Sequence, residues 1–167
     1  MKRVLLTGIS GVGKSTLTAE LAARGYYAVD ADSDEWSEWV AVHGNSGIPG
    51  DSPVEPDRDW VWREDRIRAL LAAEGAGPLF VSGSAANMGP FLPRFDHIIL
   101  LSTPPAVVVE RLATRTSNAY GKHPDEVARV LRLKQAIEPL LRAVSDHEID
   151  TSVPLEQVVA AVLQILG

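Results

Sequence analysis

Short runs of aliphatic and β-branched residues recur along the chain and alternate with longer stretches whose apolar positions repeat at helical spacing. Most of these runs are almost continuously apolar, as is typical of strands covered on both faces in a parallel sheet. They predict strands at 3–7, 26–29, 79–82, 97–101 and 148–150. The stretches with helical spacing predict helices at 14–24, 60–74, 105–115, 125–144 and 155–166. Pro139 is expected to kink or end the fourth helix, and the alternation predicts a parallel α/β fold.

Two polar stretches interrupt this alternation. Residues 42–59 are rich in Gly, Pro and acidic residues, and residues 116–124 lack an apolar period. Loops of this length inside a compact domain are usually lids or other functional segments. A disordered insertion would give the same composition.

The composition is that of one soluble globular domain over residues 1–167, with 46% hydrophobic and 23% charged residues. The net charge of −6 disfavours a protein that binds nucleic acid by neutralising phosphates. The absence of cysteine excludes disulfides, thiolate metal sites and cysteine nucleophiles. No apolar run is long enough to span a bilayer, and the N-terminal run stops at Thr7, too early for a signal peptide. We therefore expect a cytoplasmic protein.

The residues from Gly8 to Ser15 fit the phosphate-binding pattern Gly-x-x-x-x-Gly-Lys-Ser/Thr without a mismatch. Such a loop needs glycines because its backbone amides must converge on phosphate oxygens. Lys14 would reach the β- and γ-phosphates, and the Ser15 hydroxyl would bind Mg²⁺. A glycine-rich turn without a ligand is the alternative, but a predicted strand precedes the loop and a predicted helix follows it. The residues expected to bind nucleotide here are Gly8, Ser10, Gly11, Val12, Gly13, Lys14, Ser15 and Thr16.

Length and missing motifs narrow the class of nucleotide-binding protein. The base-reading sequence Asn-Lys-x-Asp is absent, which disfavours a GTPase, and a motor ATPase usually needs a longer chain. A compact phosphoryl-transfer enzyme remains, whose parts should include a lid arginine and an acceptor pocket.

Asp30 and Asp32 follow the second predicted strand. Alternate residues at the carboxyl end of a strand lie on one side, so both carboxylates would face the phosphate loop. We expect Asp30 to support Mg²⁺ and Asp32 to accept the proton of an attacking hydroxyl group. The alternative is that Asp32 or Ser33 only caps a helix that begins at residue 34.

Arg111 and Arg115 are four residues apart and share one face of the third predicted helix, ahead of Lys122 and His123 in the polar stretch. Arginine suits both stacking on a flat base and gripping a charged phosphoryl group. A solvated helix face would show the same pattern.

Taken in this order, the phosphate loop, Asp30-x-Asp32 and Arg111-x-x-x-Arg115 resemble the small P-loop metabolite kinases. That family includes shikimate kinase, gluconokinase and their adenylate-kinase-like relatives. The resemblance implies a P-loop NTPase fold, in which a five-stranded parallel sheet is flanked by helices on both faces.

The same resemblance assigns roles to further segments. It implies an acceptor-binding segment at 33–77 and a short lid at 116–124. By analogy, Arg111 stacks on adenine and Arg115 contacts phosphate. The loop from Thr151 to Pro154 lies against the adenine in that fold, so both of these residues are expected to bind the nucleotide.

The acceptor segment is similar to two branches of the family. Gly47-Ile48-Pro49 and Asp57-Arg58-Asp59-Trp60 resemble gluconokinase, and Trp62-Arg63 resembles the aromatic–arginine pair with which shikimate kinase holds a carboxylate. The His-Pro that follows Asp-x-Asp in gluconokinase is absent, and the triple glycine of shikimate kinase reads Gly83-Ser84-Ala85. Both branches place arginines near a hydroxylated acid, which implies a sugar acid or other small polyhydroxy acceptor.

All four tryptophans, at 36, 39, 60 and 62, lie in the acceptor segment. Their flat faces suit a carbohydrate-like acceptor, although they could instead form a small satellite core. We expect Trp60 and Arg63 to bind the acceptor, while the alternative is that the arginines pair with neighbouring acids on a solvated surface. Ser84 and Asn87 follow the third predicted strand, at the edge where ligands bind in open α/β sheets, and are expected to contact the acceptor or, alternatively, phosphate.

The sequence thus predicts an ATP- and Mg²⁺-dependent kinase that phosphorylates a hydroxyl group of a small molecule. Lys14, Asp32 and Arg115 are its expected catalytic residues, and Lys122 is expected to assist Arg115 as the lid closes and expels water. We expect a monomer or homodimer without nucleic-acid or membrane partners. The alternatives are a nucleoside or nucleotide kinase and a non-catalytic ATP-binding regulatory protein.

Overall fold

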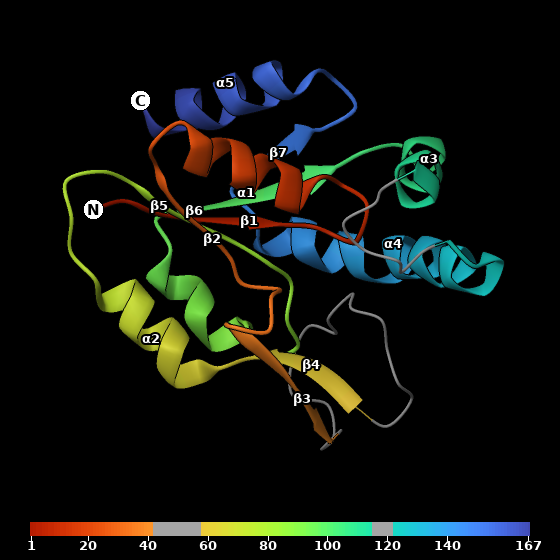
Figure 1. Ribbon diagram of the computed structural model, residues 1–167, viewed down its shortest axis with the longest axis horizontal. Helices are drawn as coiled ribbons and strands as arrows, with labels where there is room; N and C mark the ends of the chain where they lie inside the picture. The colour runs from red at the N-terminus through yellow and green to blue at the C-terminus, as the bar shows by residue number, and fades with distance from the viewer. Residues whose placement is uncertain (42–57, 115–121) are drawn as a thin grey trace.

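A five-stranded parallel sheet with the strand order β2-β5-β1-β6-β7 forms the centre of the molecule (Figure 1). The structure is a computed structural model that describes residues 1–41, 58–114 and 122–167. Each predicted strand is present, with its ends within one residue of the prediction. The strands are β1 Arg3–Thr7, β2 Tyr27–Asp30, β5 Leu79–Ser82, β6 His97–Ser102 and β7 His147–Asp150.

Helices cover both faces of this sheet, as the sequence predicts (Figure 1). Helices α1 and α5 pack on one face, and α2 lies on the other, with α4 contributing to both cores. The described helices are α1 Lys14–Ala23, α2 Glu64–Ala72, α3 Pro105–Thr114, α4 Pro124–Val144 and α5 Leu155–Leu166. None of the helices within these described ranges has the length and apolar character needed to cross a bilayer.

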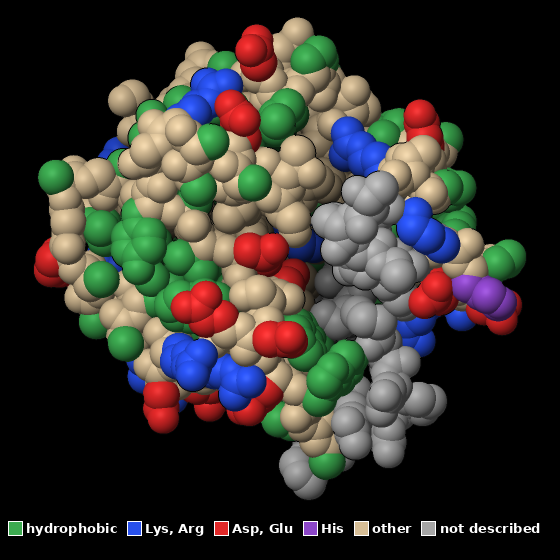
Figure 2. Space-filling view, viewed as in Figure 1, with side chains coloured by type: hydrophobic (Ala, Val, Ile, Leu, Met, Phe, Trp, Pro, Cys, Tyr) green, Lys and Arg blue, Asp and Glu red, His purple; other side chains and the backbone are tan. Residues whose placement is uncertain are grey.

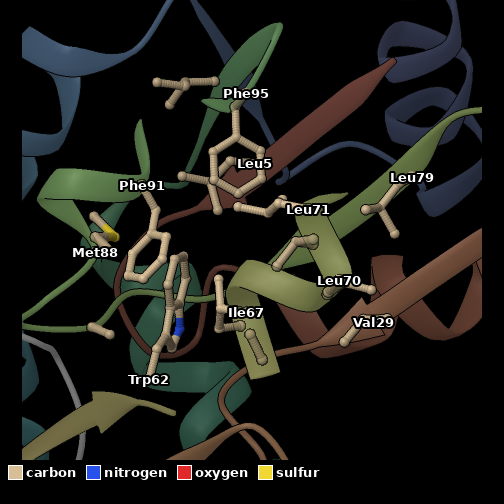
Figure 3. Close-up of a cluster of buried hydrophobic side chains, with 14 of the residues drawn as sticks. Leu5, Val29, Trp62, Ile67, Leu70, Leu71, Leu79, Met88, Phe91 and Phe95 are labelled. Atoms are coloured by element: carbon tan, nitrogen blue, oxygen red, sulfur yellow. The ribbon is translucent and has the colours of Figure 1, made fainter. Parts of the chain in front are cut away.

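Two hydrophobic cores lie on opposite sides of β1, because its side chains alternate between them. Val4 and Leu6 pack in the first core with residues of α1 and α5. Leu5 packs in the second core, where Trp62 contacts Phe91 with ring centroids 5.9 Å apart (Figure 3). Each fully buried side chain of this size contributes roughly 1.5–3 kcal/mol by leaving water, so both faces hold β1 in place.

The predicted helix at 60–74 is wrong in its first part. Residues Arg58–Trp62 form strand β4, which pairs antiparallel with β3, Ser37–Ala41, in a second, two-stranded sheet. The sequence Asp-Trp-Val-Trp is rich in aromatic and β-branched residues, which favour a strand. Helix α2 begins only at Glu64, where two acidic residues in its first turn suit the helix dipole.

Of the two effects expected of Pro139, an end of the helix is wrong, since α4 continues beyond it to Val144. Ile137 and Leu141 are both buried in the second core, and Pro139 itself is exposed. Packing on both sides of the proline therefore outweighs the loss of one backbone hydrogen bond. A further short element, the 3₁₀ helix η1 at Gly89–Arg94, was not predicted from the sequence.

Candidate active site

A cleft of about 870 Å³ opens at the carboxyl ends of the sheet strands. Its described lining comes from the phosphate loop, the turn after β2, the β3–β4 sheet, α3 and the start of α5. In an open parallel sheet this edge is where the strand order diverges and where ligands bind. The cleft therefore brings together segments that are far apart in the sequence.

The phosphate loop connects β1 directly to α1, and its glycines are required by its shape. Gly11 and Gly13 adopt left-handed φ angles of 86° and 96°. A side chain at Gly8 would place its Cβ 2.6 Å from the carbonyl oxygen of Leu101. Other residues would be strained or would clash at these positions, so the loop sequence follows from the backbone path.

Lys14 opens α1 and is buried, with only 9% of the residue exposed. Its Nζ donates hydrogen bonds to the carbonyl oxygens of Gly8 and, at 3.0 Å, Ile9. The ammonium group therefore lies over the loop that the sequence predicts to hold phosphates, at the N-terminus of a helix, where anions are favoured.

Ser15 and Asp30 meet at the floor of the cleft. The Ser15 hydroxyl donates to Asp30 Oδ2 at 3.0 Å, and Asp30 Oδ1 accepts from the backbone N–H of Asp32 at 3.0 Å. Oxygen donors of these kinds are the ones Mg²⁺ prefers. Among the described residues no three His, Cys, Asp or Glu side chains gather as a metal cluster, so an ion here would need ligands beyond this pair, such as phosphate oxygens and water.

Asp32 lines the cleft beside Asp30, as the alternation of a strand end predicts. Its Oδ1 accepts a hydrogen bond of 3.2 Å from the backbone N–H of Ser84, which follows β5. Gly83 lies against the same oxygen and against the Trp62 indole nitrogen. The Asp32 carboxylate is thus positioned by the ends of two neighbouring strands.

Arg111 ties α3 to the loop after β7. Its guanidinium donates to Thr151 Oγ1 at 3.0 Å and to the Thr151 carbonyl oxygen, and the Thr151 hydroxyl donates to the Val12 carbonyl at 2.6 Å. The pKa of the neighbouring Asp150 is lowered, chiefly because its carboxylate accepts a hydrogen bond from the Ser152 N–H. Pro154, which the sequence predicts to bind the nucleotide, is the N-cap residue of α5. Its neighbours Val153 and Leu155 line the cleft.

The predicted acceptor residues have different surroundings. Trp60 lines the cleft and pairs across the β3–β4 sheet with Trp39, at 5.0 Å between ring centroids. Arg63 instead donates to Glu38 at 2.9 Å, outside the described cleft lining. Asn87 exchanges two hydrogen bonds with the backbone of Trp62, at 2.9 and 3.0 Å.

The Ser84 side chain is fully buried, and no hydrogen-bond partner is described for its hydroxyl. Arg115 and most of the predicted lid at 116–124 lie outside the described residues. Lys122 lies inside them, where its Nζ donates to the Ala113 carbonyl at 2.9 Å.

Asp34 and Trp39 line the cleft, although neither was among the residues expected to bind the acceptor. Asp34 continues the alternation of Asp30 and Asp32, a signal that could have included it. Trp39 was named with the other tryptophans of the acceptor segment. Its contact with Trp60, 21 positions away, was not predicted, because the pairing of β3 with β4 was not.

Comparison with known proteins shows that this chain is similar to kinases. A shikimate kinase of Halorhodospira halophila is 27% identical over 157 residues, covering 90% of this chain and 84% of its own. A thymidylate kinase of Xylella fastidiosa is 24% identical over 190 residues, covering 98% and 91%. The predicted resemblance to P-loop small-metabolite kinases is confirmed, and the names of these relatives support an ATP-dependent kinase.

Solved structures agree with the fold. A shikimate kinase from Acinetobacter baumannii in complex with shikimate superposes with a TM-score of 0.62 at 19% identity, covering 99% of this chain and 93% of that one. A gluconokinase from Sinorhizobium meliloti gives 0.56 at 20% identity, covering 99% and 93%. A family model described as an AAA domain matches residues 4–132. The chain therefore belongs to this AAA domain family and has the P-loop NTPase fold that its sequence predicts.

Proposed function

We propose that this protein transfers the γ-phosphoryl group of ATP to a hydroxyl group of a small polyhydroxy metabolite. The observation that carries the proposal is the arrangement of Ser15, Asp30 and Asp32 in one cleft with the phosphate loop. A protein that only binds ATP needs the loop but has no need of a second carboxylate positioned by Ser84 beside it.

The residues divide the reaction between them. The amides of the loop and Lys14 bind the triphosphate, and Ser15 with Asp30 would hold Mg²⁺, which offsets negative charge on the phosphates. Asp32 orients the acceptor hydroxyl and accepts its proton as the oxygen bonds to the γ-phosphorus. The bond from that phosphorus to the bridging oxygen breaks, and ADP leaves.

Arg115 and Lys122 are proposed to neutralise charge on the transferring group, and Arg111, Thr151 and Pro154 to border the adenine. The contact of Arg111 with Thr151 supports this placement, since it fixes both residues beside the loop. We further propose a cytoplasmic monomer or homodimer that acts on a small molecule.

The protein has three candidate functions, two of which differ in the acceptor. The resemblance implies a sugar acid or other polyhydroxy acid, through Trp60, Arg63, Ser84 and Asn87. A nucleoside or nucleotide kinase is the second candidate, favoured by the thymidylate kinase relative and by the two tryptophan rings that could stack on a base. A non-catalytic ATP-binding regulator is the third.

Acceptor-dependent release of ADP tests the proposal. The purified protein is supplied with ATP and Mg²⁺ and a panel of polyols, sugar acids, shikimate and nucleosides, beside Lys14→Ala and Asp32→Asn. We expect one class to stimulate release, with at least about a hundredfold loss in both variants. Tight ATP binding without stimulation by any acceptor would favour the regulator instead. An unchanged Asp32→Asn rate would contradict the role proposed for Asp32.

A further inference from the structure

Two histidines lie side by side at the amino ends of neighbouring strands in the central sheet. His97 begins β6 and His147 begins β7, and their ring centroids are 5.6 Å apart, with the rings inclined at 45°. The two strands are parallel, and His147 is in register with Ile99. His97 precedes Ile99 by two residues, so both imidazoles lie on the same face of the sheet.

This histidine pair is at the opposite edge of the sheet from the cleft, which lies at the carboxyl ends of the strands. His97 is in register with Val4 of β1, and Lys2 donates to the Leu166 carbonyl oxygen at the end of α5 at 2.7 Å. Figure 1 accordingly shows both chain termini on one side of the molecule, with α3 and the first turns of α4 on the other. The pair therefore lies outside the site of the proposed function, and its properties do not depend on that function.

An aspartate precedes each histidine and fixes the start of its strand. Asp96 exchanges two hydrogen bonds with the backbone of Arg3 on β1: its carboxylate accepts from the Arg3 N–H and its own N–H donates to the Arg3 carbonyl oxygen, both at 2.7 Å. Asp146 does the same with the backbone of Ile98 on β6, both at 2.8 Å. The backbone positions of the two histidines are therefore held before any ligand binds, which lowers the entropy cost of bringing them together.

The ring nitrogens of the pair are accessible to a ligand. His147 is exposed and His97 is partly exposed. Among the described histidines, His123 is the one whose ring takes part in a hydrogen bond, since its Nδ1 accepts from the Asp125 N–H at 3.2 Å. No three His, Asp or Glu side chains within the described ranges form a metal cluster, so the pair would supply two ligands and water the others.

Two adjacent imidazoles suit a particular class of metal ion. Imidazole nitrogen is a common ligand of Zn²⁺, Ni²⁺ and Cu²⁺, whereas Mg²⁺ prefers oxygen ligands. With metal–nitrogen bonds of about 2.0–2.1 Å, two imidazoles on one ion have ring centroids roughly 4.5–6.5 Å apart. The separation of 5.6 Å between His97 and His147 lies within this range. The backbone thus holds the rings at a separation that one ion can bridge.

We propose that His97 and His147 together bind one divalent transition-metal ion of the Zn²⁺, Ni²⁺ and Cu²⁺ class. The ion links β7, at the edge of the described sheet, to β6, which pairs on its other side with β1. In the unfolded chain the two ligands are no longer held together, so the ion binds the folded form more tightly and stabilises it. The site is thus a structural metal site that is separate from the Mg²⁺ site proposed at the cleft.

Calorimetric titration with Ni²⁺ tests the proposal. The full chain without a histidine tag is titrated in excess Mg²⁺, which occupies sites made of oxygen ligands. We expect one Ni²⁺ ion per chain, and at least about tenfold weaker binding in His97→Gln and in His147→Gln, because a single imidazole loses the two-point attachment. His147 is exposed, so its replacement is expected to leave the fold intact. Absence of Ni²⁺ binding in the unmodified protein, or an unchanged affinity in His147→Gln, overturns the proposal.

His123→Gln is the matched control. His123 is the N-cap residue of α4, and Figure 2 shows a histidine side chain at the outer edge of the molecule near the start of that helix. It is exposed and does not belong to the pair, so its replacement is expected to leave the Ni²⁺ affinity unchanged. A loss of affinity in His123→Gln equal to that in His147→Gln would contradict a site at the pair.

Electron paramagnetic resonance of bound Cu²⁺ gives a second readout, because it counts the nitrogen ligands of the ion. Two nitrogen ligands are expected in the unmodified protein and one or none in His147→Gln. Urea denaturation gives a third, since Ni²⁺ is expected to raise the denaturation midpoint of the unmodified protein and not that of His147→Gln. The same nitrogen count in both proteins, or an equal rise in both midpoints, overturns the proposal.

Discussion

The Asp32 carboxylate lies against a backbone position that has no room for a side chain. A Cβ atom at Gly83 would come within 3.0 Å of Asp32 Oδ1 and 3.1 Å of Trp62 Nε1. Neither neighbour can move freely, because Asp32 accepts from the Ser84 N–H and Trp62 is 99% buried, with only 1% exposed. A glycine here therefore fixes where the carboxylate stands relative to the phosphate loop.

Gly83→Ala is expected to displace Asp32 and to lower kcat on the order of tenfold to a hundredfold, since small misplacements of a reacting group are costly. The KM for ATP should change little, because the loop and Lys14 are not touched. Steady-state kinetics measure both, with Gly77→Ala as control, where an added Cβ meets nothing within 4 Å. An unchanged kcat in Gly83→Ala would show that Asp32 is not positioned in this way.

The positions of some site residues could be predicted from the sequence and those of others could not, for a physical reason. Asp30 and Asp32 could be placed together because a strand has a fixed two-residue period. Arg63 could not be placed, since a long side chain can reach several partners, and its partner Glu38 lies on β3, which was not predicted. The roles given to these residues stay predictions.

Helix α4 shows how tertiary packing overrides a local signal. Pro139 lacks the N–H that would bond to Gln135, yet the helix continues because Ile137 and Leu141 are buried on either side of it. The proline is exposed, so its replacement would leave no cavity.

Pro139→Ala is expected to raise the free energy of unfolding by about 1–2 kcal/mol. The gain of a backbone hydrogen bond and of helix propensity is offset in part by the greater freedom of the unfolded chain. Urea denaturation measures the change, with Leu140→Ala, at an exposed neighbour, as control. A lower free energy of unfolding in Pro139→Ala would contradict this expectation and would mean that Pro139 stabilises α4.

An ion pair connects strand β7 to helix α4. Glu148 accepts from the Arg142 guanidinium at 2.7 Å, and this bond is the main reason that the pKa of Glu148 lies below its ordinary value of 4.5. A carboxyl group whose pKa is lowered by folding stabilises the fold above its ordinary pKa. That contribution is lost as the pH falls through the lowered value.

Glu148→Gln is therefore expected to lower the free energy of unfolding at pH 7 by roughly 0.5–1 kcal/mol, as for other exposed ion pairs. The difference from the unmodified protein should shrink as the pH falls below 4.5 toward the lowered pKa. Denaturant titrations at several pH values check this, with Glu110→Gln as control. A difference that does not vary with pH would rule out the ion pair as its cause.

At the scale of elements, the central strands β1, β5 and β6 could be predicted because each is an apolar run that is almost fully buried, whereas the edge strands β2 and β7 are more exposed. The β3–β4 sheet could not, because its strands are short, only partly buried and separated by 16 residues without a recognisable hairpin turn. The contact between Trp39 and Trp60 at the cleft was not predicted for this reason.

The overall topology of the molecule could be predicted from the alternation of strands and helices. This alternation requires a parallel sheet, whose strands all have their carboxyl ends at one edge. The phosphate loop, the turn after β2 and the loop after β7 meet at that edge. The position of the cleft could thus be predicted from the order of elements. The partners of Arg63 and Arg66 could not, because they depend on the folded positions of Glu38 and Glu35.

The two halves of the cleft are attached to the molecule in different ways. The phosphate loop continues β1, which is paired on both edges and buried on both faces. Such a strand exchanges its amide hydrogens only when the whole molecule unfolds, whereas a two-stranded sheet such as β3–β4 can open locally at lower cost. Mutations in β3 and β4 could therefore change which acceptor is bound while leaving the phosphate machinery intact, so that one nucleotide-binding frame can give rise to kinases with different acceptors.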